Sequence, residues 1–194
     1  TWPARRSLSS FASRAKRLTG VRRSAQTLGR MTTTVRSALL SEAEALSRLV
    51  HESFLALAAA EWEEQAVAKF LQDSSPSSLA ESIESSFLAC AAFVDEQLAG
   101  FALMPRASLL GMLFVSPSHV GRGVARLLWE HVRSEVEQRA PEVKTVELNS
   151  TPYAVSAYRA LGFYPISEQF YFEGCLATRM ACWLPGRAMA KNAA

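Results

Sequence analysis

The sequence has few cysteines and lacks any long apolar run. Its three cysteines, Cys90, Cys175 and Cys182, show no C-x-x-C spacing, so neither a disulfide framework nor a metal site is indicated. We expect reduced thiols inside a core, and a reducing, cytoplasmic location for the protein. The apolar run Phe87–Val94 is far shorter than the roughly 20 residues that cross a membrane, so no membrane partner is expected.

Acidic side chains are missing from residues 1–30, which carry eight of the 21 basic side chains. The other 13 basic and 18 acidic side chains give residues 31–194 a net charge of −5, which does not favour a nucleic-acid partner. This Ser- and Arg-rich leader is expected to be disordered. Three interpretations fit the leader. It is an organelle transit peptide, which implies a mitochondrial or plastid location, or an upstream extension without a role, or a nucleic-acid-binding tail.

Hydrophobic residues make up 49% of the chain, and residues 31–186 are expected to form one domain, followed by a tail at 187–194. Ser41 and Glu44 are expected to form a capping box at the first helix, and Pro76 to lie in a polar break. The expected elements are, in order, a strand at 33–38, helices at 41–57, at 60–71 and ending near 85, strands at 87–94, 98–104 and 109–115, a helix at 121–139, a strand at 143–148, a short helix ending at Gly162, and a hairpin of 163–172 with 175–184. This order is typical of an α/β (α+β) domain with a mixed sheet flanked by helices.

Two glycines, Gly121 and Gly123, stand between an expected strand and an expected helix, in the stretch SPSHVGRGVARLLWEHV at 116–132. Glycine is unfavourable within a helix, but at a helix start it lets a phosphate approach the backbone. The N–H groups of a first helical turn lack partners, the helix dipole adds positive charge there, and Arg122 supplies a cation. The stretch predicts a phosphate or pyrophosphate site; a turn without a ligand is the alternative.

A dinucleotide-binding fingerprint is a second interpretation of the same glycines. It would read G-x-G-x-x-G, and Arg126 stands where the third glycine belongs. Glu147 on the next expected strand suits a ribose-binding acid. A dinucleotide fold should carry its fingerprint near its start, whereas only about 70 residues follow here.

A second stretch, LNSTPYAVSAYRALGF at 148–163, follows the next expected strand. Together the two stretches resemble the GCN5-related N-acetyltransferase (GNAT) family over residues 33–184. The family's acetyl-CoA signature, Q/R-x-x-G-x-G/A, falls on residues 120–125, with Val120 in place of Gln or Arg. Its downstream signature, N-x-x-A-x-x-x-Y-x-x-x-G-F, is matched, with Thr151 replacing Asn, by Ala154, Tyr158, Gly162 and Phe163.

The resemblance implies the GNAT fold, with a mostly antiparallel sheet, and transfer of acetyl from acetyl-CoA, as co-substrate and without a metal, to a primary amine by direct attack. The pantetheine arm would pair with the backbone of Phe114 and Val115, in a gap beside the strand that carries Glu147. Tyr158 would be the general acid. The remaining cofactor contacts implied by the motifs are Val120, Gly121, Arg122, Gly123, Val124, Ala125, Asn149, Thr151 and Ala154.

The general base is not evident from the sequence. Glu147 shares a strand face with Asn149 and is a candidate that would act through water. His51 and Glu52 on the first helix are further candidates, and His119 suits the phosphate loop. Surface exposure is expected for His131.

The acceptor is open to a small molecule or a protein, and a homodimer is possible. A cationic acceptor would suit Trp62, Glu63 and Glu64, although a solvated acidic face explains the same residues. The alternatives to the enzyme are a nucleotide- or NAD-binding α/β domain and a non-catalytic, CoA-binding regulatory module.

Overall fold

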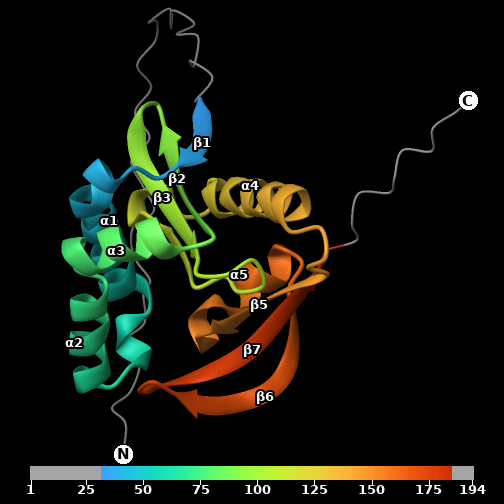
Figure 1. Cartoon of the computed structure of the whole chain (residues 1–194). Helices are drawn as coiled ribbons and strands as arrows, with labels where there is room; N and C mark the ends of the chain where they lie inside the picture. The colour runs from blue at the N-terminus through green and yellow to red at the C-terminus, as the bar shows by residue number, and fades with distance from the viewer. Residues whose placement is uncertain (1–31, 185–194) are drawn as a thin grey trace, which may run out of the picture. The chain divides into compact units, whose positions relative to one another are not determined.

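Two antiparallel sheets form the framework of the computed structural model, which describes residues 32–184. The expected leader (1–30) and tail (187–194) lie outside the described residues. One sheet has the strand order β1-β2-β3-β4 and the other has the order β5-β7-β6 (Figure 1). The strands are β1 (Thr33–Ser37), β2 (Leu88–Val94), β3 (Gln97–Met104), β4 (Met112–Val115), β5 (Thr145–Ser150), β6 (Tyr164–Phe172) and β7 (Cys175–Trp183).

Helices cover both faces of the four-stranded sheet. Phe101 and Leu103 of β3 pack with α1 and α3 on one face, whereas Ala102 and Met104 pack with α4 on the other. This alternation explains why β2 is apolar throughout and β3 lacks polar side chains after Gln97, since both faces of these strands are buried. The helices are α1 (Ala43–Leu57), α2 (Glu64–Asp73), α3 (Pro76–Ser85), α4 (Val124–Arg139) and α5 (Val155–Ala160), with short 3₁₀ turns at η1 (Leu40–Glu42), η2 (Ala59–Glu61), η3 (Pro117–His119) and η4 (Pro152–Ala154).

The predicted α+β class and the two predicted hairpins are confirmed. The turn between β2 and β3 is one residue tighter than expected, because Asp95 and Glu96 both take positive φ values of 47° and 67°. That pair of conformations suits the twist of a two-residue hairpin. Within residues 32–184, all pairings between the named strands are antiparallel, and the bridge of Leu109 with Glu147 is parallel. This arrangement disagrees with the parallel sheet of a dinucleotide-binding domain.

Two predictions about helix starts are wrong. The expected capping box of Ser41 with Glu44 does not form; instead the N–H of Leu39 donates to Glu42 Oε2 at 2.9 Å, and η1 precedes the helix. Pro76 does not lie in a break but opens α3. A proline suits the first helical position, where no N–H partner is required.

The strand expected at 109–115 is divided into two parts. The N–H of Leu110 donates to the carbonyl oxygen of Glu147 at 2.9 Å, so the first part pairs with β5. The N–H of Gly111 donates to the carbonyl oxygen of Leu103 at 2.9 Å, so the second part pairs with β3. The chain thus changes partner at Gly111, and β4 and β5 diverge beyond this point.

The helix expected at 121–139 begins at Val124, and the strand expected at 143–148 runs instead from Thr145 to Ser150. The three cysteines are buried, and no disulfide joins them. Within residues 32–184, no helix has the length and apolar character needed to cross a bilayer.

Candidate active site

The free backbone edges of β4 and β5 face the space in which the two strands diverge. On β4, the N–H of Ser116 donates to the carbonyl oxygen of Ala99, which fixes the alternation of its hydrogen bonds. The N–H and C=O groups of Leu113 and Val115 therefore point away from β3. On β5, both backbone groups of Glu147 bond to residues 108–110, so those of Asn149, two residues later, point toward the same opening.

The alternation corrects one sequence expectation. The backbone groups of Phe114 face β3 and are not available to a ligand, whereas those of Val115 lie at the free edge. Leu113 lies there too and was missed, because the sequence does not show which edge of the strand stays open. The carbonyl oxygen of Val115 already accepts a bond from Ser53 Oγ at 2.9 Å, which leaves its second lone pair available.

The glycine loop at the start of α4 has the geometry of an anion site. Gly121 and Gly123 have φ values of 78° and 84°, and a Cβ on either would meet nothing within 4 Å. The first bond of α4 runs from the N–H of Leu127 to the carbonyl oxygen of Gly123 at 3.1 Å. The N–H groups before it, those of Val124 and Ala125 included, have no partner within the helix, so they are available to an anion.

The residues of the glycine loop differ in which groups, backbone or side chain, they leave available to a ligand. The N–H of Arg122 is occupied by the carbonyl oxygen of His119 at 3.2 Å, so only its side chain is available. Val120 is 48% exposed, whereas the side chain of Val124 is buried in the core and contributes only its backbone. His119 Nδ1 lies 2.9 Å from Ser118 Oγ in the same loop.

Tyr158 lies on α5, with its ring edge-on to Phe163 at a centroid distance of 5.6 Å. Burial alone raises the pKa of Tyr158 to about 12, so the hydroxyl is protonated at neutral pH. Ahead of it, the side chain of Thr151 makes no capping hydrogen bond to the helix. The carbonyl oxygen of Thr151 instead accepts the N–H of Ala154 at 3.0 Å, and Gly162 ends α5 as predicted, with φ at 95°.

Glu147 and Asn149 share one face of β5, as predicted, because the alternate residues Val146, Leu148 and Ser150 are buried on the opposite face. Glu147 lines an open hollow of 380 Å³ on the face that carries α1 and α3 on the neighbouring sheet. The other lining residues are Ile166, Ser167, Phe170 and Arg179. None of them was singled out from the sequence.

Residues 58–184 match the family model for the acetyltransferase (GNAT) domain. The chain belongs to the GNAT acetyltransferase family. It is 28% identical over 89 residues to the peptidyl-lysine N-acetyltransferase YiaC of Escherichia coli (strain K12), a match that covers 46% of this chain and 58% of that relative. The chain thus spans less than two thirds of this curated relative.

Solved structures show the same GNAT fold. A GCN5-related N-acetyltransferase from Rhodopseudomonas palustris superposes with a TM-score of 0.69 at 21% identity, over 79% of this chain and 96% of that one. The PaiA N-acetyltransferase of Thermoplasma acidophilum, solved in complex with coenzyme A, gives 0.66 at 19% identity, over 79% of this chain and 99% of that one.

The two further candidates for the base of this GNAT domain, His51 and Glu52, lie elsewhere. His51 Nε2 lies 3.1 Å from both the carbonyl oxygen and Oγ of Ser74, at the junction of α2 and α3. Glu52 lines a separate hollow of 230 Å³. His131 is partly buried on α4 rather than fully exposed. Of the predicted bases, only Glu147 lines the hollow beside the diverging strands.

The segment between η2 and α2 closes one side of the GNAT domain against the β6–β7 hairpin. The N–H of Glu63 donates to the carbonyl oxygen of Gly174 at 2.9 Å, and Trp62 forms an isolated β-bridge with Cys175. Glu61 Oε2 accepts the N–H of Tyr153 at 3.1 Å. These contacts place the residues suspected of acceptor binding next to the hairpin tip, whereas Glu64 begins α2.

Proposed function

We propose that the protein transfers the acetyl group of acetyl-CoA to the primary amine of an acceptor. The observation that carries the proposal is the pair of free backbone edges on β4 and β5. These edges offer hydrogen bonds to an extended amide chain such as the pantetheine arm. The glycine loop at the start of α4 adds a cradle for the pyrophosphate.

The cofactor contacts are assigned to three places. Leu113, Val115 and Asn149 would pair with the pantetheine arm through their backbones. The N–H groups of Gly121 and Gly123–Ala125, with the side chain of Arg122, would hold the pyrophosphate. Val120, Thr151 and Ala154 would line the approach.

The chemistry needs one proton to leave the amine and one to reach the sulfur. The acceptor nitrogen attacks the thioester carbonyl, so that a C–N bond forms and the C–S bond breaks. Glu147 would take the proton of the ammonium group through a water molecule, as general base. Tyr158, protonated at neutral pH, would give its proton to the departing thiolate as general acid, and it would take up the second proton that the nitrogen loses as the amide forms.

The acceptor is an amine of a small molecule or of a protein. YiaC is named for its action on peptidyl-lysine, which makes a lysine side chain one candidate acceptor. The conclusion that the acceptor carries an amine does not depend on this relative, because Glu147 suits deprotonation of any ammonium group that enters the hollow.

Two measurements test the proposal. Calorimetric titration should show binding of acetyl-CoA and none of NADH. An acetyl-CoA-dependent screen over amines, followed by release of free CoA thiol, should then find turnover. Binding without turnover of any amine would favour the non-catalytic CoA-binding module, and lack of binding would contradict the proposal.

A further inference from the structure

We propose that the acceptor carries a carboxylate near its amine, and that Arg179 binds this carboxylate in the hollow. The inference rests on the proposed function and names the class of acceptor for the same site. Two opposite charges line the hollow, the carboxylate of Glu147 and the guanidinium of Arg179. An amino acid or a related zwitterion has the complementary pair of charges.

The two charged residues face the hollow from neighbouring strands. Glu147 is paired with Ala181 across β5 and β7, and Asn149 is paired with Arg179. Residues paired in this way point to the same face, so Glu147 and Arg179 are diagonal neighbours across the two strands. Such neighbours have Cα atoms about 7–8 Å apart. This separation leaves room for a ligand between them. The ion pairs found within residues 32–184 include neither side chain.

A wide bulge in β6 lies opposite Arg179. Pro165 is paired with Met180 and Gln169 with Thr178, so three residues of β6 stand where regular pairing needs one. Bulges of this kind redirect side chains and are common beside active sites. Ile166 and Ser167 in the bulge form a wall of the hollow.

The bulge also orients Arg179. Ser167 Oγ accepts the backbone N–H of Arg179 at 3.0 Å, which satisfies the donor that loses its partner in the bulge. The guanidinium lies 6.0 Å from the ring centroid of Phe170, a cation–π contact that leaves its N–H donors free. A guanidinium with free donors binds a carboxylate through two parallel hydrogen bonds.

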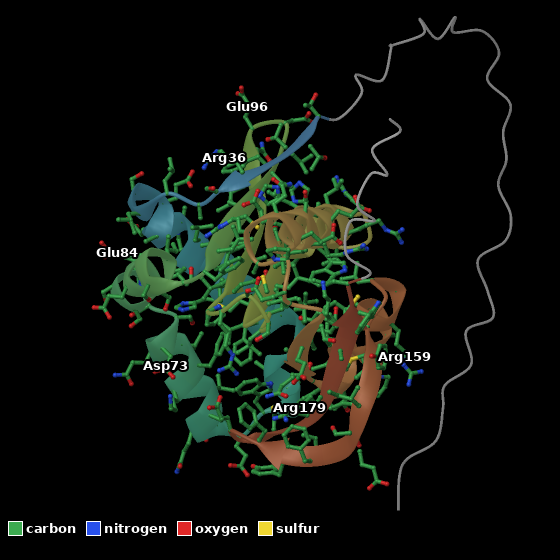
Figure 2. The ribbon with its side chains drawn as sticks, turned by 45° about the vertical axis from the view of Figure 1, so that its right-hand side comes forward. Arg36, Asp73, Glu84, Glu96, Arg159 and Arg179 are labelled. Atoms are coloured by element: carbon green, nitrogen blue, oxygen red, sulfur yellow. The ribbon has the colours of Figure 1, made fainter. Side chains whose placement is uncertain are left out.

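The position of Arg179 differs from that of the other labelled arginine on this part of the chain. In Figure 2, Arg179 lies on the side of the β6–β7 hairpin toward α2, whereas Arg159 extends from the opposite side. Arg159 is an exposed residue of α5, does not line the hollow and has no ion-pair partner among the bridges found. It is therefore a matched control.

The test compares acids with amides. Standard α-amino acids and ω-amino acids of increasing length are offered as acceptors, each beside its primary amide, at saturating acetyl-CoA. The wild type should acetylate the preferred acid with a kcat/KM about 10- to 100-fold above that of its amide, as expected for hydrogen bonds to a charged group. Arg179→Gln should lose this factor for the acid and leave the amide within about twofold. Arg159→Gln should change neither.

Two controls keep the result interpretable. The melting temperature and acetyl-CoA affinity of Arg179→Gln should equal those of the wild type, since the residue is outside the cofactor contacts. An end-blocked lysine peptide without a free carboxylate serves as the competing acceptor. The inference is wrong if the lysine peptide or the amides are acetylated as well as the acids. It is also wrong if no acid is acetylated by protein that binds acetyl-CoA. In either case the proposed binding of acetyl-CoA stands. Failure to bind acetyl-CoA overturns both.

Discussion

Glu63 donates its backbone N–H to the carbonyl oxygen of Gly174 over 2.9 Å, and this bond fastens the tip of the β6–β7 hairpin to the start of α2. In Figure 1 the tip of the hairpin lies beside the lower end of α2. The bond joins two segments that are more than 100 residues apart in the sequence, the residue before α2 and the turn between β6 and β7. Because strands of this hairpin line the hollow, the shape of the hollow depends on how closely the tip can approach the helix.

Gly174→Ala should loosen this contact. Its φ is +87°, and a Cβ there would overlap the Cβ of Ala66. We expect a loss of about 1–3 kcal/mol in the free energy of unfolding and a higher KM for the acceptor, with an unchanged Kd for acetyl-CoA. Adding Ala66→Gly should remove the overlap and recover part of the acceptor KM. An acceptor KM equal to that of the wild type would show that the tip does not shape the acceptor side.

Gly123→Glu should abolish acetyl-CoA binding. The substitution places a side chain and a negative charge in the open space beside the unpaired N–H groups of α4. Gly123→Ala is the control for backbone strain at φ +84° and should weaken binding much less. Arg122→Ala should weaken binding by no more than about fivefold, as expected for an exposed cation. Calorimetric titration with acetyl-CoA measures all three, and wild-type affinity of the glutamate variant would place the cradle elsewhere.

Tyr158→Phe should slow the chemical step by about 10- to 1,000-fold, the effect of losing one general acid. Acetyl-CoA affinity should hardly change, because only the hydroxyl oxygen is removed and the ring still packs on Phe163. The measurement is a single-turnover rate at saturating acetyl-CoA and acceptor. An unchanged rate would leave Tyr158 with a packing role alone.

Tyr158 also predicts a pH effect on stability. Burial in the folded protein raises its pKa from the ordinary tyrosine value of 10.0 to about 12, so the folded state holds this proton more tightly than the unfolded state. The resulting stabilisation is complete below pH 10 and is lost as the pH rises toward 12. Urea unfolding of wild type and Tyr158→Phe between pH 8 and pH 11.5 checks this. The two curves should converge or cross at the alkaline end, and parallel curves would contradict the prediction.

The cysteines should resist thiol reagents in the folded protein. Burial raises the pKa of the Cys90 thiol to about 12, and it is the first cause of the raised pKa values of Cys175 and Cys182. Because the thiolate is the reactive form, Ellman's reagent at pH 8 should react slowly before unfolding and with three thiols per chain after it. Rapid labelling of the native protein would show that the β7 thiols become accessible through opening of the hairpin.

Local sequence predicted the elements whose ends depend on one or two residues. Gly162 ends α5 because it takes a φ of 95°, and Asp95 and Glu96 form a tight turn. The start of α1 could not be predicted in this way. Glu42 bonds to the N–H of Leu39 and to Arg36 of β1, and this contact with a neighbouring strand is preferred over the expected box at Ser41.

The residues of the candidate site also differ in how far the local sequence predicts them. The open glycine loop was predicted from spacing, because the proposed anion site uses consecutive backbone groups. The place of Arg179 in the wall of the hollow could not be predicted, since it depends on the pairing of β6 with β7 and on the bulge between Pro165 and Gln169. Leu113 and Phe114 exchange roles for a related reason, because only the pairing with β3 decides which backbone groups stay free.

The strand β5 offers three independent sets of groups. Val146 and Leu148 are buried in the core, the backbone of Asn149 faces the diverging strand, and the side chain of Glu147 faces the hollow. A change of side chain at an odd-numbered position of this strand therefore leaves both the core and the backbone edge as they are. Under the proposed function, the choice of amine can therefore change by substitution on one face of β5 while the groups that hold the acyl donor stay the same.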